Sequence, residues 1–284
     1  MLSQQEKTLN RKRSEYLTLK SMCLSNTEFR SESDIKLYKQ IIVDVPRTMP
    51  EYKFFQQPVI REMLINILYI WNLRHPASGY VQGINDICTP FIIVFLSEYI
   101  PNIFPSIECT DTDLKTITKE IFNKIEADVY NCLCSIIDRL QSIYIANQPG
   151  AQKMMEKMQI ILKRVNPELE NHLNSQGVLF VQFAFRWINC LLMREFTLPT
   201  VIRMWDTYFS EEDSTEVFHV YVCVALIVHF KKEILSRDFQ SIILFMQDLP
   251  TKSWNIDDMR TLMSEAYLLK KLFENAQNHL KNQG

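Results

Sequence analysis

The sequence predicts an all-α protein, and three observations support this. Apolar residues recur with helical spacing through most of the chain. No Asn-Gly or Asp-Gly hairpin turn separates alternating segments, and the β-branched run 40–45 is a weak strand signal. The 284 residues include five glycines, while hydrophobic residues make up 47% and supply a sizeable core. We expect one elongated, two-lobed domain over residues 1–284, with a lobe boundary near 97–113, where prolines and acidic residues interrupt the pattern.

The clearest helical patterns lie at 57–75, 178–195, 199–209, 214–235 and 256–277. In the first segment, Pro58 suits an opening turn and Pro76 ends the helix. The second is apolar nearly all round, which predicts a central buried helix. The fourth opens on Ser214 and Thr215, which are cap candidates. The last begins with acids and carries its bases nearer its end, as the helix dipole prefers.

Charge and cysteine content exclude several classes of function. The net charge of −2 and pI near 6.2 argue against a broad nucleic-acid surface, which is normally strongly basic. The most basic run, 11–20, carries an internal Glu, so we assign it to a solvated helix face. The seven cysteines form no CxxC pair, so no zinc or thioredoxin-like site is predicted, and free thiols indicate the cytosol.

The sequence also predicts no direct membrane insertion and no self-contained active site. The N-terminus resembles no signal peptide, and the apolar stretches 90–96 and 220–228 are shorter than the ~20 residues that cross a bilayer. The patterns GxxxxGK[ST], GxGxxG, HExxH and GxSxG do not occur. Such a chain is either a binding protein or one that supplies groups to the active site of another protein.

Two stretches interrupt the helical spacing of apolar residues and contain polar residues. In "QIIVDVPRTMP", prolines 46 and 50 place Arg47 on a rigid, non-helical turn, and Asp44 is close enough to hold its guanidinium. In "HPASGYVQGINDI", residues 75–87, Gly79 permits a turn and Gly83 permits close backbone approach, so a stiff loop presents Tyr80 and Gln82. Taken singly, the first is typical of a surface charge or structural ion pair, and the second of a turn between helices.

Together these stretches resemble a known family. "IIVDVPR" (41–47) matches the IxxDxxR motif, and "YVQG" (80–83) the YxQG motif, of the TBC-domain family of Rab GTPase-activating proteins. Residues 179–196 and 202–210 resemble later helices of that family. The resemblance runs from about 8–16 to 265–273. The residues in these segments are most similar to those of the Golgi-associated yeast Gyp-type branch of the family.

The resemblance implies a two-lobed helical TBC domain that acts on a Rab-family small GTPase in its GTP-bound state. It makes Arg47 an arginine finger and Gln82 a glutamine finger, both inserted in trans. Asp44 would orient Arg47, Tyr80 would support the loop and partner contacts, and Gly83 would allow close approach. GTP and magnesium would belong to the partner, so no cofactor or nucleotide site of its own is implied. The implied location is the cytoplasm, peripheral at Golgi membranes through partners, in vesicle trafficking.

Departures from the family pattern leave other interpretations open. Family domains usually begin with an arginine-and-tryptophan element before a KRxEY-like segment, whereas "RKRSEY" (11–16) already stands near the start here. We therefore expect the first family helices to be missing. One alternative is a non-catalytic Rab-binding or scaffolding module, and another is an unrelated helical scaffold whose motifs are coincidental.

Overall fold

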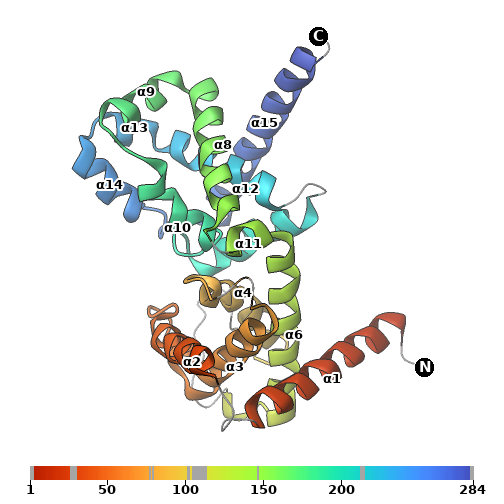
Figure 1. The fold of residues 1–284 in the computed structure, drawn as a ribbon. Coiled ribbons are helices and arrows are strands. Elements are labelled where there is room, and N and C mark those ends of the chain that lie inside the picture. Colours follow the sequence, from red (N-terminus) through yellow and green to blue (C-terminus); the bar gives the residue numbers. More distant parts are fainter. Residues whose placement is uncertain are drawn as a thin grey trace. The chain divides into compact units, whose positions relative to one another are not determined.

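The computed structural model describes residues 3–25, 31–76, 78, 80–100, 103, 114–145, 147–211 and 215–281, with side chains up to Phe273. Within these ranges the chain forms helices and turns and no β-strand, which confirms the all-α prediction (Figure 1). The residues divide into two compact units. Unit 1 comprises 1–138 and 144–146, and unit 2 comprises 139–143 and 147–284. The segment 97–113, where the sequence suggested a boundary, lies mostly outside the described residues, and its described residues 97–100 and 103 are grouped with unit 1.

Unit 1 is built around a buried helix. Its elements are α1 (Gln4–Ser25), α2 (Glu32–Asp44), η2 (Val45–Arg47), η3 (Lys53–Gln56), α3 (Pro58–Arg74), α4 (Ile84–Leu96) and α6 (Lys119–Arg139). The predicted helix 57–75 is confirmed as α3, which contacts α1, α2 and α4. Its apolar stripe is buried in full: Ile60, Met63, Leu64, Ile67, Leu68 and Trp71.

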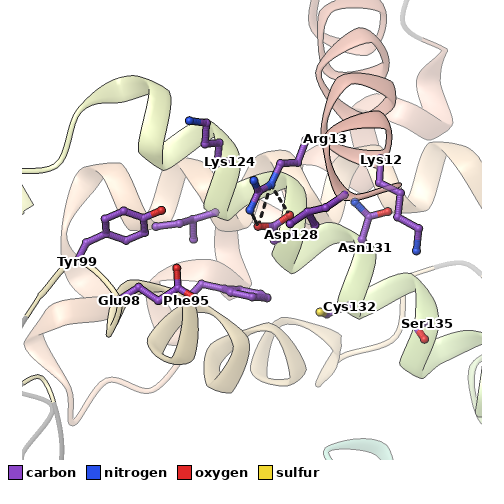
Figure 2. A pocket seen from close by; sticks show the side chains of 12 residues that line it. Lys12, Arg13, Phe95, Glu98, Tyr99, Lys124, Asp128, Asn131, Cys132 and Ser135 are labelled. Atoms are coloured by element: carbon purple, nitrogen blue, oxygen red, sulfur yellow. Dashed lines mark hydrogen bonds and ion pairs between the residues drawn. The ribbon is translucent and has the colours of Figure 1, made fainter. Parts of the chain in front are cut away.

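Hydrogen bonds and ion pairs between polar side chains connect helix α1 to α6. Arg13 forms a fork with Asp128, with Nε 2.9 Å from Oδ1, beside a cavity of about 360 Å³ (Figure 2). The Tyr16 hydroxyl donates to Glu126 Oε1 at 2.6 Å, and Lys20 Nζ lies 2.8 Å from the same carboxylate. The sequence assigned this basic run to a solvated helix face, which is wrong for Arg13. The residue reaches a partner 115 positions away, and spacing within one helix gives no sign of this.

Unit 2 is centred on α12. Its helices are α7 (Gln141–Tyr144), α8 (Pro149–Val165), α9 (Pro167–Ser175), α10 (Ala184–Asn189), α11 (Leu198–Ser210), α12 (Thr215–His229), α13 (Lys231–Leu235), α14 (Phe239–Gln247) and α15 (Ile256–Lys281), with η4 at Phe180–Gln182. Only Tyr144, at the end of α7, is grouped with unit 1. Helix α12 is buried on most sides and contacts α8, α10, α11 and α15 (Figure 1). The predicted helices 199–209 and 256–277 are confirmed as α11 and α15.

Two predicted helices of unit 2 are wrong as continuous elements. Residues 178–195 form η4 and the short α10, and Leu191 and Leu192 then take left-handed backbone with φ of 47° and 60°. Residues 214–235 break at Phe230, between α12 and α13, while Ser214 lies outside the described residues. Leu191 and Phe230, which lie at the two breaks, are both buried, and tertiary packing can override helix propensity.

Among the described residues, no helix combines the length and apolar character needed to cross a membrane. The described cysteines form no disulfide: Cys23, Cys88, Cys132, Cys134, Cys190 and Cys223 are free thiols. Cys109 lies outside the described residues.

Candidate functional site

Arg47 sits at the end of a tight turn in unit 1. Helix α2 ends at Asp44, and Pro46 lies in the first positions of the 3₁₀ turn η2, where its missing N–H costs nothing. The Thr48 N–H donates to Val45 O at 3.1 Å and closes the turn. The Arg47 side chain is exposed and makes no hydrogen bond or ion pair with any residue that the structure describes. Its guanidinium is therefore available to a partner molecule.

The backbone after Arg47 is held by contacts of the two buried residues that follow it. Thr48 is fully buried, and its carbonyl oxygen accepts from Gln56 Nε2 at 3.4 Å. Met49 is buried with a φ of 43°, in the left-handed region that a non-glycine residue rarely adopts. The Tyr52 N–H donates to Met49 O at 3.0 Å. The turn that carries Arg47 is thus fixed by its surroundings rather than by contacts of Arg47 itself.

Gln82 projects from the loop before α4. Gly83 has a φ of 109°, which explains why glycine stands at this position, and it caps the N-terminus of α4. The Ile84 N–H donates to Val81 O at 3.2 Å, so the loop turns sharply at Gln82. The Gln82 side chain is exposed and makes no hydrogen bond with a described residue. Gly79, which the sequence assigns to the same turn, lies outside the described residues.

Asp44 lies beside Tyr80 rather than in an ion pair with Arg47. The sequence predicted that Asp44 would hold the Arg47 guanidinium, but no such pair occurs between these two described residues. Burial, and next the charge of Asp44, raise the pKa of Tyr80 well above its usual range, so the phenol stays protonated. The Tyr80 hydroxyl is buried and makes no hydrogen bond of good geometry with a described residue, Asp44 included. Asp44 and Tyr80 therefore place the end of α2 next to the loop of Gln82.

Asn85 joins the two loops, and sequence reasoning did not identify it. Its Nδ2 donates to Thr48 Oγ1 at 2.8 Å, and its Oδ1 accepts from the Gly83 N–H at 3.1 Å. Thr48 directly follows Arg47 and Gly83 directly follows Gln82, so one buried carboxamide connects the two segments. A polar residue one position into an apolar helix was the available signal, but the sequence does not reveal its partner.

The arrangement offers a guanidinium and a carboxamide on adjoining loops, with exposed apolar side chains nearby. Ile42 and Val43, in the last turn of α2, are 42% and 53% exposed. Within the described ranges, no group of three or more His, Cys, Asp or Glu is placed to hold a metal ion. The cavity beside Arg13 and Asp128 is lined by none of the residues predicted for the site.

Comparison with known proteins identifies relatives of this chain. Residues 1–235 match the Rab-GTPase-TBC domain family. The chain is 44% identical over 280 residues to the GTPase-activating protein gyp1 of Schizosaccharomyces pombe, covering 98% of this chain and 54% of that protein. It is 42% identical over 275 residues to human TBC1 domain family member 22B, covering 96% and 53%. The chain thus spans about half the length of the curated relatives it matches.

The fold agrees as well. The crystal structure of the Ypt/Rab-GAP domain of Gyp1p superposes with a TM-score of 0.89 at 42% identity, covering 95% of this chain and 83% of that one. The match of the family over most of the chain, together with this fold, shows that the chain belongs to the Rab-GTPase-TBC domain family.

Proposed function

We propose that this chain is a GTPase-activating protein that accelerates GTP hydrolysis on a Rab-type small GTPase by supplying Arg47 and Gln82 in trans. The observation that carries the proposal is the pairing of these two exposed side chains. Each lacks a partner among the described residues, and each projects from a loop whose backbone is fixed by buried contacts. Membership of the family and the names of the relatives support the same activity.

The role proposed for Arg47 follows from the charge of the transition state. Phosphoryl transfer spreads negative charge over the oxygens of the transferring group. A guanidinium presents several N–H donors in a planar fork and neutralises this charge where it develops. An arginine supplied in trans is worth about 10³–10⁵ in kcat, which is about 4–7 kcal/mol of barrier. Lysine is a point charge without the fork, so Arg47→Lys should not restore the rate.

The role proposed for Gln82 is to orient the attacking water. A carboxamide has both a donor and an acceptor, so it can hold a water and align its lone pair with the phosphorus. Small GTPases carry a glutamine of their own for this task. We infer that Gln82 takes it over, while Gly83 lets the loop backbone approach the nucleotide. Asp44 and Tyr80 support the loop from behind and border the partner contact.

The partner would be a Rab GTPase in its GTP-bound state, which brings the nucleotide and its magnesium ion. The exposed Ile42 and Val43 border Arg47 along α2 and would meet an apolar part of that GTPase. We place the protein in the cytoplasm, held at Golgi membranes through its partners, and the resemblance to the Gyp-type branch supports this. Loss of Golgi staining on depletion of the cognate GTPase would test the location.

The test is single-turnover GTP hydrolysis by a panel of Rab GTPases with the 284-residue chain. We expect strong acceleration for at least one GTPase, and a loss of about 10³-fold or more in Arg47→Ala and in Arg47→Lys. Gln82→Ala should lose much of the acceleration too. Glu15→Gln, an exposed change on α1, serves as the matched control.

Two outcomes would contradict the proposal. If the chain accelerates GTP hydrolysis by none of the Rab GTPases in the panel, it does not have the proposed activity. Binding of a GTP-loaded Rab that is unaltered in Arg47→Ala, without faster hydrolysis by the parent, would instead identify a non-catalytic Rab-binding module.

A further inference from the structure

The Asn85 carboxamide makes three hydrogen bonds inside unit 1. Asn85 is 2% exposed in the first turn of α4. Its Nδ2 donates to Thr48 Oγ1 at 2.8 Å and to Asp86 Oδ1 at 3.3 Å, and its Oδ1 accepts from the Gly83 N–H at 3.1 Å. The amide nitrogen of Asn85 therefore donates to the loop of Arg47, and the amide oxygen accepts from the loop of Gln82.

The residues it joins stand next to the two proposed catalytic side chains. Thr48 follows Arg47 along the chain, and Gly83 follows Gln82. Thr48 Oγ1 also lies 3.4 Å from Asp44 O, so this hydroxyl donates back to the end of α2 while it accepts from Asn85. A carboxamide can donate and accept at once, whereas a carboxylate of the same shape can only accept. The pattern of donors and acceptors thus requires an amide at this position.

No described residue holds the side chains of Arg47 and Gln82 directly. Both are exposed and make no polar contact with a described residue, so their positions follow from the backbone beneath them. That backbone takes unusual conformations on both sides of the link, with φ of 43° at Met49 and 109° at Gly83. Such conformations persist when the surrounding structure determines them.

We propose that Asn85 is a positioning residue that sets the spacing between Arg47 and Gln82. This inference rests on the proposed function of the two side chains. A displacement of about 1 Å in a catalytic group can cost about 10²-fold in rate. Removing the link should therefore lower the rate of the chemical step, while the surface that binds the GTPase is kept.

The test measures single-turnover hydrolysis at increasing concentrations of the chain, with a GTPase that the parent chain stimulates. The maximal rate should fall about 10²-fold in Asn85→Ala and in Thr48→Val, with little change in the concentration at half-maximal rate. Thr48→Ser keeps the hydroxyl and should keep the parental maximum. The control is Asn72→Ala, a buried asparagine of α3 whose Nδ2 donates to Leu68 O within its own helix, and it should also keep that maximum.

A second measurement does not depend on activity. The Gly83 amide hydrogen bonds to Asn85, so its hydrogen exchange should quicken in Asn85→Ala and stay slow in Asn72→Ala. The proposal is overturned if folded Asn85→Ala and Thr48→Val keep the parental maximal rate. It is also overturned if Thr48→Ser loses as much as Thr48→Val. A parent chain that stimulates no GTPase would refute the proposed function instead, and hydrogen exchange at Gly83 would then test the bond between Gly83 and Asn85 on its own.

Discussion

The side chains around Arg47 illustrate how single residues prepare a site without touching its chemistry. Asp44 was expected to hold Arg47, yet it lies beside the buried hydroxyl of Tyr80. The sequence motif places an acid three residues before the arginine, but the 3₁₀ turn that separates them decides where each side chain goes. Arg47 and Gln82 could be proposed as site residues from the sequence because their motifs are distinctive. Thr48 and Asn85 could not, because the hydrogen bond between them joins separate segments of the chain.

The buried Tyr80 hydroxyl, which makes no hydrogen bond of good geometry with a described residue, leads to a prediction about stability. A buried hydroxyl without a hydrogen bond costs about 1–3 kcal/mol of desolvation. Tyr80→Phe removes this cost and keeps the ring, so we expect the free energy of unfolding of the isolated chain to stay the same or rise by up to about 2 kcal/mol. Urea denaturation measures this change.

The control for this prediction is Tyr99→Phe, at a residue that is 38% exposed. That change should alter the free energy of unfolding by less than about 0.5 kcal/mol. A loss of more than about 1 kcal/mol in Tyr80→Phe would mean that the hydroxyl has a partner in solution.

At the scale of elements, helix α1 is held by charged hydrogen bonds rather than by its apolar face. Its mean hydropathy is low, and Tyr16 is the one residue of α1 that is fully buried. Tyr16 and Lys20 reach Glu126, and Arg13 reaches Asp128. Burial raises the pKa of Glu126, while the contacts with Lys20 and Tyr16 lower it. The carboxylate therefore depends on these two residues to remain charged.

Tyr16→Phe should therefore weaken the attachment of α1. A hydrogen bond to a charged, buried carboxylate contributes about 1.5–3 kcal/mol, and we expect a loss of this size in the free energy of unfolding. Hydrogen exchange across α1 should quicken at the same time. Glu15→Gln, whose surface ion pair with Arg11 is exposed, should leave both quantities nearly unchanged. Equal losses in the two variants would show that the bond to Glu126 does not hold the helix.

Helix existence was predicted better than helix continuity. The apolar spacing in α3 and the proline near the start of α11 are local signals, and both helices form where they were predicted. The break after α10 has no Gly or Pro to announce it. There the Leu191 carbonyl accepts from Trp205 Nε1 at 3.3 Å, a contact between distant segments. At Phe230, where α12 gives way to α13, the ring packs on Trp254 and Phe245, which the local sequence pattern does not reveal.

At the scale of the whole molecule, each unit has its own buried polar cluster. In unit 2, His219 is fully buried between Tyr208, whose hydroxyl lies 2.8 Å from Nδ1, and Cys223, whose sulfur lies 3.4 Å from Nε2. Burial lowers the pKa of His219 to about 4. Its ordinary value is about 6.5, so between these two pH values the unfolded chain binds a proton that the folded chain does not.

The free energy of unfolding should therefore fall as the pH drops from about 6.5 to 4, by up to about 3 kcal/mol from this group. His219→Gln should remove that part of the dependence, and the difference between parent and variant, measured by urea denaturation from pH 7 to 4, isolates it. The subtraction also cancels the contribution of Glu195 to the pH dependence. Burial raises the pKa of Glu195 to about 7, so its contribution to the free energy of unfolding has the opposite sign. Parallel curves for parent and variant would contradict the prediction.

Gln82 is proposed to enter the partner's active site and to orient the water there. The most direct test uses a Rab GTPase that the chain stimulates and whose own water-orienting glutamine has been replaced by alanine. We predict that the parent chain still accelerates single-turnover hydrolysis by this GTPase, and that Gln82→Ala and Arg47→Ala do not. If the GTPase without its glutamine is no longer stimulated, while the unaltered GTPase is stimulated equally by the parent and by Gln82→Ala, the account is contradicted.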